Sequence, residues 1–332
     1  MGNLALTVAC GPYDRTEALR TGAVLVEGID LTYLPIQSPP EIFNRMVQKD
    51  SFDVAEMSVS LYMTRRSEGR FPFVALPIFP SRLFRHGFIF VNVDAGIREP
   101  KDLEGKRVGV QEFRQTAAVW IRGILHREYG VDLDSIHWLE GGVNAPRHPG
   151  TVMDLRPEEH QAVGLVEFIP EGRTLSDMLA SGEIDAFIGA RRPFSLGKSP
   201  RVARLFPNYR AVERAYYQKT GIFPIMHTLV LRERLYAEKP WVAESIFKAF
   251  EQAKAWALEQ MRFSGAMRYM LPWLYDDIDE LDALFGADPW PYGLEPNRAT
   301  LETLMQFLVD QRFLPKPTPV DQLFVPIVTA NE

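Results

Sequence analysis

Residues 76–92 read LPIFPSRLFRHGFIFVN, and this stretch decides how the chain is divided. It begins with an apolar run that proline interrupts twice, and it closes on a short apolar strand expected at 88–91. Between them lie three basic residues within five positions: Arg82, Arg85 and His86. Such a trio is either a solvated bend or the lining of an anion site. We predict that the chain leaves a first lobe here and that Arg82 and His86 face a gap between two lobes, whereas Arg85 points outward.

The composition indicates a soluble globular protein. Its 332 residues suit one large domain or two lobes, and 46% hydrophobic residues are enough for a sizeable core. The net charge of −6 argues against a general nucleic-acid partner. No apolar run reaches the length of a membrane span, and the N-terminal residues do not resemble a signal peptide. Cys10 is the single cysteine, so no internal disulfide is expected and a cytoplasmic location is predicted.

Strands and helices alternate along the chain, which favours parallel βαβ units and an α/β fold class. The pattern runs to about residue 92, restarts, and then returns through an apolar strand at 222–231. We therefore predict a two-lobed fold with a ligand cleft between lobes joined by two crossing segments. Residues 1–91 and 226–332 would form a discontinuous first lobe, and residues 92–225 an inserted second lobe.

Two further segments carry expectations of their own. The stretch 141–161 is rich in Gly, Pro, His and charge, so we expect a surface insertion, a lid or a contact for another subunit. An amphipathic helix is expected at 241–258, and a second helix near 264–274.

Ligands of open α/β folds bind at the carboxyl ends of strands, where helices begin and expose free N–H groups. Four strand–helix junctions qualify here: Cys10–Arg15, Met57–Ser60, Gln111–Thr116 and Gly189–Arg192. Helix starts lined by Ser, Thr and Arg suit a carboxylate or a phosphate. We take Ser58, Gln115 and Thr116 as neutral hydrogen-bond donors to such a ligand, although Gln115 and Thr116 could simply cap a helix.

The charged candidates have equally clear structural alternatives. Arg82 can bind a carboxylate through two N–H groups, and His86 can exchange a proton near neutral pH. Glu56 lies within the apolar sequence VAEMS, so its carboxylate must either form a salt bridge or have a functional role. His227 lies in the apolar strand IFPIMHTLV and is either a satisfied core residue or a cleft residue. Arg191 and Arg192 follow another apolar strand, where a salt bridge is the alternative to ligand binding.

Motifs for common cofactors do not occur in the sequence. There is no GxGxxG after a strand, no GxxxxGK[ST], no HExxH, no CxxC and no GxSxG. The histidines are scattered, so no local pattern announces a metal site.

Several blocks resemble the 4,5-dihydroxyphthalate decarboxylase family, a branch of the type II periplasmic-binding-protein-like fold. They include AEMSVS at 55–60, PIFPSRLFRHG at 77–87, GKRVGVQEFRQTAAVWIRGIL at 105–125, IPEGRTLSDMLASGEIDAFIGARRP at 169–193, TGIFPIMHTLVLR at 220–232, PWVAESIFKAFEQAK at 240–254 and DPWPYGLEPNRATLE at 288–302. The blocks span nearly the whole chain. The segment 141–161 departs from the family pattern.

The resemblance implies an enzyme of aromatic-compound catabolism, such as phthalate degradation, that removes CO2 from a hydroxylated aromatic acid. It needs no electron-sink cofactor, because the ring itself accepts the electrons; a divalent ion on adjacent hydroxyls is a second option. His86 or His227 would donate the proton, with Glu56 orienting a histidine or accepting from a hydroxyl. Arg82 and Arg191 or Arg192 would bind a second carboxylate.

Two other classes of function remain as alternatives. One is the solute-binding protein of an ABC transporter, with the same cleft and no catalysis. The other is a different small-molecule enzyme on this fold, such as one for pyrimidine or menaquinone precursors. The expected partners are a small aromatic carboxylate and, in a homo-oligomer, further copies of the chain. No nucleic acid and no membrane is expected.

Overall fold

The structure, a computed structural model, describes residues 2–147, 150–164 and 166–327. It divides the chain into two compact units. Unit 1 contains the residues up to Arg82, the segment His227–Leu301 and the residues from Thr318 onward. Unit 2 contains Leu83–Met226 and Glu302–Pro317. The first crossing thus comes at 82–83, earlier than the expected 91–92, and a C-terminal segment joins unit 2. The cleft expected between lobes stays a prediction.

Unit 1 is built on one mixed sheet. In the described residues the strand order is β2-β1-β3-β11-β4. These strands are β1 (Leu4–Cys10), β2 (Ile29–Pro35), β3 (Val54–Ser58), β4 (Phe73–Arg82) and β11 (Ile225–Arg232). Strand β1 pairs in parallel with β2 and β3, while β11 runs antiparallel to β3. Because β4 is the last strand in this order, its prolines Pro77 and Pro80 can lie where a missing N–H is tolerated.

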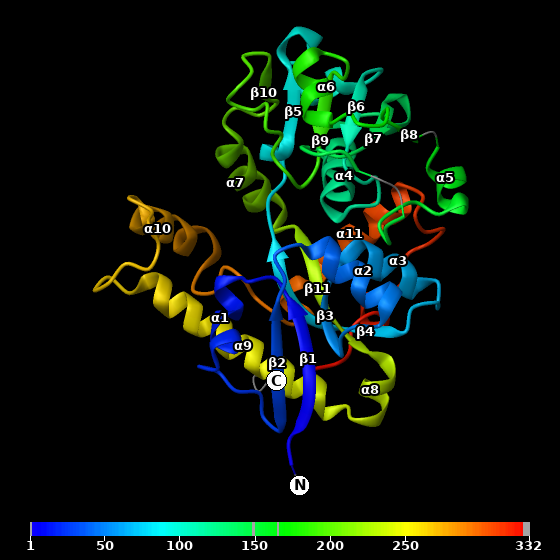
Figure 1. The fold of residues 1–332 in the computed structure, drawn as a ribbon. Coiled ribbons are helices and arrows are strands. Elements are labelled where there is room, and N and C mark those ends of the chain that lie inside the picture. Colours follow the sequence, from blue (N-terminus) through cyan, green and yellow to red (C-terminus); the bar gives the residue numbers. More distant parts are fainter. Residues whose placement is uncertain (1, 148–149, 165, 328–332) are drawn as a thin grey trace. The chain divides into compact units, whose positions relative to one another are not determined.

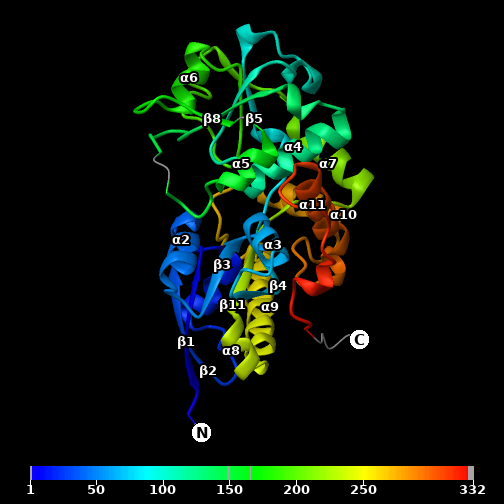
Figure 2. The ribbon, with the colours of Figure 1, turned by 90° about the vertical axis from the view of Figure 1, so that its right-hand side faces the viewer.

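Helices cover both sides of this sheet. The helices of unit 1 are α1 (Glu17–Thr21), α2 (Pro39–Lys49), α3 (Val59–Ser67), α8 (Glu233–Glu238), α9 (Trp241–Arg262) and α10 (Leu274–Phe285). Figures 1 and 2 show α2 on one side of the strands and the long helix α9 on the other. Helix α9 buries an apolar stripe that includes Val242, Ile246 and Phe250.

Unit 2 has its own sheet, with the order β10-β5-β9-β6-β7-β8 in the described residues. Its strands are β5 (Ile89–Asn92), β6 (Arg107–Val110), β7 (His137–Glu140), β8 (Val166–Phe168), β9 (Ala186–Ile188) and β10 (Val202–Arg204). Strands β9, β6, β7 and β8 pair in parallel, whereas β5 pairs antiparallel with β9, and β10 pairs antiparallel with β5. The carboxyl ends of β6, β7 and β9 therefore meet at one edge.

The helices of unit 2 are α4 (Thr116–Tyr129), α5 (Pro157–Val163), α6 (Leu175–Ser181) and α7 (Tyr209–Thr220). A further helix, α11 (Arg298–Asp310), begins in unit 1 and ends in unit 2. It lies beside α4 in both views (Figures 1 and 2), where Phe307 packs edge-on against Trp120 at a centroid distance of 5.4 Å. The side chain of Gln311, just beyond α11, accepts from Arg122 Nε at 2.9 Å. These contacts attach the C-terminal segment to unit 2.

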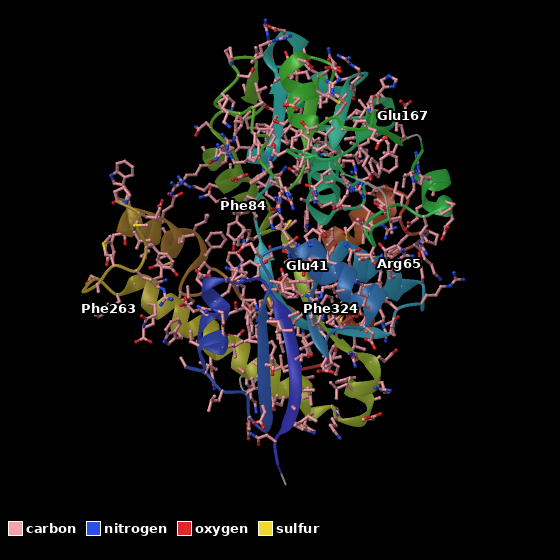
Figure 3. All side chains as sticks on the ribbon, in the orientation of Figure 1. Glu41, Arg65, Phe84, Glu167, Phe263 and Phe324 are labelled. Carbon is pink, nitrogen blue, oxygen red and sulfur yellow. The ribbon has the colours of Figure 1, made fainter. Side chains whose placement is uncertain are left out.

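The two segments that leave unit 2 lie side by side within it. Leu83 N–H donates to the Pro224 carbonyl at 3.1 Å, and the rings of Phe84 and Phe223 stack at 4.6 Å. Figure 3 labels Phe84 at this place. Both crossings are therefore held together by a backbone hydrogen bond and a ring contact.

Some local predictions differ from the structure. The helix expected near 264–274 is wrong, since the next helix begins only at Leu274. Gly265 and Pro272 explain this, because glycine disfavours a helix interior and the residue before proline avoids the helical region. The insertion 141–161, of which 148–149 lie outside the described residues, contains the start of α5. None of the helices in the described part of the chain is both long enough and apolar enough to cross a membrane.

Candidate active site

In unit 1, the pairing of β3 with β11 brings three of the predicted residues together. Glu56 and Ser58 are two positions apart on β3, so their side chains leave the same face of the strand. His227 on β11 is the direct cross-strand partner of Ser58. It is therefore a diagonal neighbour of Glu56, at a spacing that a long side chain can bridge.

Glu56 is fully buried, and both of its carboxylate oxygens have donors. Oε1 accepts from the Tyr13 hydroxyl at 2.6 Å and lies 2.5 Å from His227 Nδ1. Oε2 accepts from the Gly11 N–H at 2.8 Å and from the Cys10 thiol at 3.4 Å. Burial alone raises the pKa of Glu56, but the hydrogen bonds and charge of His227 and the bond from Tyr13 outweigh it and lower the pKa. The carboxylate is therefore ionised although it is dry.

The ionised carboxylate keeps its neighbours protonated. Burial and then the charge of Glu56 raise the pKa of the Cys10 thiol well above its usual value. The same two causes raise the pKa of the Tyr13 phenol. Both groups are thus neutral hydrogen-bond donors at physiological pH. Neither carries a negative charge that would repel an anionic ligand.

His227 is oriented by this carboxylate. With an N–H on Nδ1 donating to Glu56, the second ring nitrogen, Nε2, has no hydrogen-bond partner among the described residues. The edge contact with Phe43, at 5.1 Å between centroids, limits rotation of the ring. The side chain is 18% exposed, so a ligand can reach Nε2. A histidine held in this way can take a proton at Nε2 and give it to a bound molecule.

Ser58 and Arg82 have structural contacts in unit 1. The Ser58 hydroxyl accepts from Leu61 N–H at 3.4 Å and caps α3. The Arg82 guanidinium donates to the Pro291 carbonyl at 2.8 Å and to the Asn297 side chain. Arg82 is buried and holds the segment that leads into α11. The substrate-binding roles expected for both residues stay predictions.

His86 lies in unit 2, in an aromatic surrounding. Its ring is 5.2 Å from Tyr216 and 5.6 Å from Phe206, between centroids, and the residue is only 2% exposed. Neither ring nitrogen has a hydrogen-bond partner in the part of the chain that the structure describes. Burial lowers the pKa of His86 to about 4, against an opposing effect of Glu128. The imidazole is therefore neutral at physiological pH.

Arg85, which was expected to point outward, is buried instead. Its Nε donates to Met226 Sδ at 3.2 Å, and burial lowers its pKa to about 9. The expectation of an outward side chain is wrong, because residues 85 and 86 both lie inside the packing of unit 2.

The remaining candidates lie at the carboxyl edge of the unit 2 sheet. Gln115 precedes α4 and its amide is 3.4 Å from Glu112 Oε2, while Thr116 is buried at the first helical position. Arg191 and Arg192 are exposed beyond β9, and the charge of Arg191 acts on Glu112. Glu112 itself was not singled out from the sequence. Burial raises its pKa to about 7, although Arg147 opposes the shift.

The structure thus gathers Glu56, Ser58 and His227 in unit 1, and Gln115, Thr116 and Arg191 along one edge of unit 2. Sequence reasoning missed Tyr13, although the junction Cys10–Arg15 that contains it was marked as a strand end. For metals, the described residues contain no group of three or more His, Cys, Asp or Glu side chains that could hold an ion.

Two curated relatives share a name. A protein from Comamonas testosteroni named 4,5-dihydroxyphthalate decarboxylase is 39% identical over 306 residues, which cover 92% of this chain and 91% of that protein. A protein of the same name from Pseudomonas putida is 37% identical over 220 residues, which cover 66% of this chain and 83% of that protein. A scan against protein-family models found no match.

Solved structures resemble the fold at much lower identity. The periplasmic aliphatic sulphonate binding protein SsuA from Escherichia coli aligns with a TM-score of 0.55 and 12% identity, covering 97% of this chain and 98% of that chain. A Candida albicans protein described as having the generic periplasmic binding protein fold aligns with a TM-score of 0.50 and 12% identity, covering 99% of both chains. These structural alignments confirm the periplasmic-binding-protein-like fold predicted from the sequence. At identities this low they show nothing about ligands.

Proposed function

Since the chain belongs to the 4,5-dihydroxyphthalate decarboxylase family, we propose that it removes CO2 from a hydroxylated aromatic acid such as 4,5-dihydroxyphthalate and releases protocatechuate. The single observation that carries the mechanism is the pair of Glu56 and His227. A buried carboxylate fixes one ring nitrogen, and the other is accessible.

The proposed reaction is a protonation followed by a bond cleavage. Protonated His227 gives the Nε2 proton to the ring carbon that bears the departing carboxylate, while a ring hydroxyl supplies electron density. The bond between that carbon and the carboxylate then breaks, its electron pair restores the aromatic ring, and CO2 leaves. His227 regains a proton from water. Glu56 stabilises the positive imidazolium that precedes the transfer, and so acts as a positioning residue.

His227 is favoured over His86 as the proton donor for a physical reason. A donor must carry a proton near neutral pH and must be reachable. His86 is buried and its pKa of about 4 leaves it neutral, whereas His227 is partly exposed and has a carboxylate partner. In this proposal His86 has a structural role.

Product formation tests the proposed function directly. The protein is incubated with 4,5-dihydroxyphthalate while CO2 and protocatechuate are measured, with and without a chelator. We expect stoichiometric release of both products. A loss of turnover with chelator would point to the divalent-ion option. Tight binding of the substrate without CO2 would overturn the proposal and favour the solute-binding alternative.

Two variants then test the assignment of the residues. His227→Asn should lower kcat by roughly 10²-fold or more, because general acid catalysis contributes factors of that size, while substrate affinity changes little. Glu56→Gln should also lower kcat, since an amide cannot stabilise the imidazolium. Glu41→Gln, an exposed glutamate on α2 that Figure 3 labels, is the matched control and should keep full activity. Full turnover in His227→Asn would remove this histidine from the proton-donor role.

The proposal extends to the setting of the enzyme. We place it in the cytoplasm, in phthalate degradation, as a homo-oligomer. The reduced, buried Cys10 is compatible with a reducing compartment. Support for self-association comes from the segment between α9 and α10, which exposes five large apolar side chains: Phe263, Met267, Met270, Leu271 and Trp273.

A further inference from the structure

Arg15 places a guanidinium on the same loop that supplies Tyr13 to Glu56. It lies in the short 3-10 helix η1 (Asp14–Thr16), two residues after Tyr13. Its side chain is 16% exposed, so solvent and solutes reach it. Its charge also acts on Tyr13 and Cys10, which shows that it lies within electrostatic range of the Glu56 cluster.

Two aromatic rings hold this guanidinium in place. Its central carbon lies 4.2 Å from the Tyr13 ring centroid and 4.3 Å from that of Trp290. Each ring is itself fixed, Tyr13 by its hydrogen bond to Glu56 and Trp290 by donating from Nε1 to the Phe79 carbonyl at 2.8 Å. A cation held between two fixed rings loses little freedom when it binds an anion.

The hydrogen bonds of Arg15 leave its end free. Nε and Nη2 donate to the Pro80 carbonyl, and Nη1 donates to Asp14 at 2.9 Å. A guanidinium has five N–H groups, so two remain, one on each terminal nitrogen. Neither has a further partner among the described residues. An N–H on each of the two terminal nitrogens is the donor set with which a guanidinium binds both oxygens of a carboxylate.

Arg82 and Arg85 have different surroundings from Arg15. In unit 1, Arg82 donates to a backbone carbonyl and to Asn297, and it is buried. In unit 2, Arg85 lies in an apolar interior against Met226. Arg15 combines access, fixed orientation and a free donor pair with a direct link, through Tyr13, to the proposed proton-transfer residues.

We infer that Arg15 binds the carboxylate that the reaction leaves on the ring. Tyr13 then serves both parts of the site, since its ring face carries the guanidinium and its hydroxyl holds Glu56. The ligand class is an aromatic carboxylate. The identity of the retained carboxylate rests on the proposed function, while the binding itself can be measured without turnover.

The test compares an anionic ligand with a neutral ester of the same dihydroxylated ring. Isothermal titration calorimetry measures the affinity of protocatechuate and of its methyl ester, which keeps the ring and hydroxyls but has no anionic group. The wild type should prefer the acid by roughly 30- to 100-fold, the range expected for a charged pair of hydrogen bonds. Arg15→Gln should remove this preference by weakening the acid and leaving the ester unchanged. Arg15→Lys, which keeps the charge but not the fork, should retain roughly a tenfold preference.

Arg20→Gln is the matched control, because Arg20 is an exposed arginine on α1 that pairs with Glu17. It should behave as the wild type. The inference is overturned if the wild type shows no preference for the acid, or if either Arg15 variant keeps the full preference. Should Arg15→Gln fail to fold, the wild-type and Arg15→Lys measurements still decide.

The two proposals fail separately. An Arg15-dependent preference for the acid in a protein that releases no CO2 would contradict the proposed function and support the role of Arg15. Release of CO2 together with an unchanged preference in Arg15→Gln would do the reverse.

Discussion

Two buried ionisable side chains, Glu56 and His86, have different surroundings. Glu56 is therefore ionised at physiological pH, whereas His86 is neutral. A carboxylate in a dry interior is costly unless donors surround it, and Glu56 has four of them. An imidazole in a dry interior without partners avoids the cost by staying neutral, as His86 does. Polar partners thus keep Glu56 ionised in the interior, and their absence keeps His86 neutral and makes its contribution to stability sensitive to acid.

The acid sensitivity of His86 gives a prediction. Its pKa is about 4 in the folded protein against an ordinary 6.5, so between these values the unfolded chain binds more protons. The contribution of neutral His86 to the free energy of unfolding is therefore complete above about pH 6.5, and it decreases as the pH drops toward 4. At pH 5 the loss should be about 2 kcal/mol. His86→Phe fits the aromatic surrounding and cannot be protonated, so urea denaturation at pH 5 and pH 7.5 should show a smaller loss.

His137→Phe is the control for this measurement, because it replaces an exposed imidazole in the same unit. It should retain the full loss of stability at pH 5. An identical pH dependence in wild type and His86→Phe would contradict the prediction. Loss of turnover in a stably folded His86→Phe would return this residue to the list of catalytic candidates.

Sequence reasoning reached some of these residues and not others, for identifiable reasons. Glu56 and His227 stood out because a charged or polar group within an apolar strand needs an explanation. Tyr13 and Arg15 did not, since a tyrosine and an arginine near a turn are ordinary in a sequence. Their importance comes from what they touch, and those contacts reach Glu56, Pro80 and Trp290 across long stretches of chain.

At the scale of elements, the position of a segment in the sheet determines whether a run that contains proline can form a strand. The run 73–82 contains two prolines and yet forms a ten-residue strand, because β4 is the last strand in the sheet order. In contrast, the end of α4 has a local signal in the sequence, because Gly130 adopts the left-handed conformation at its C-terminus. Local signals were sufficient where caps mark an element and insufficient where the neighbouring strand matters.

Gly123 in α4 offers a test in which helix propensity and packing predict opposite signs. Propensity alone makes Gly→Ala in a helix interior stabilising by about 1 kcal/mol. Here a Cβ at residue 123 would overlap the ring of Phe307, which packs against α4 from α11. We therefore expect Gly123→Ala to lower the free energy of unfolding by about 1–3 kcal/mol, measured by urea denaturation.

A second substitution separates packing from other causes. Phe307→Leu shortens the side chain that the new Cβ would meet. The double variant should be more stable than the sum of the two single changes implies, by about 1 kcal/mol or more. Simple additivity, or a stabilising effect of Gly123→Ala alone, would show that α11 does not pack this closely on α4.

At the scale of the whole molecule, the division into two units followed from the return of the strand–helix pattern after residue 92. The exact crossings did not, because residues 83–91 and 302–317 belong to unit 2 through contacts that no local pattern announces. Phe307, Gln311 and Phe313 make those contacts with α4 and the residues just before it. A C-terminal segment that returns to the inserted unit can be found only from tertiary structure.

We expect the chain to self-associate through the segment between α9 and α10. Between α9 and α10, Met270 is fully exposed and Trp273 is 72% exposed, and Figure 3 labels Phe263 at the start of this segment. The following helix α10 has the acidic sequence LYDDIDELDALF, which disfavours an anionic lipid surface and leaves an apolar protein surface as the better partner. A second copy of the chain presents such a surface in the same segment, so the contact can be symmetric.

Light scattering after size-exclusion chromatography should give a multiple of 37.8 kDa for the wild type and a lower mass for the double variant Met270→Ser, Trp273→Ser. Leu25→Ser, at an 80% exposed leucine elsewhere in unit 1, should leave the mass unchanged, and a wild-type monomer or an unaltered mass in the double variant would contradict the prediction.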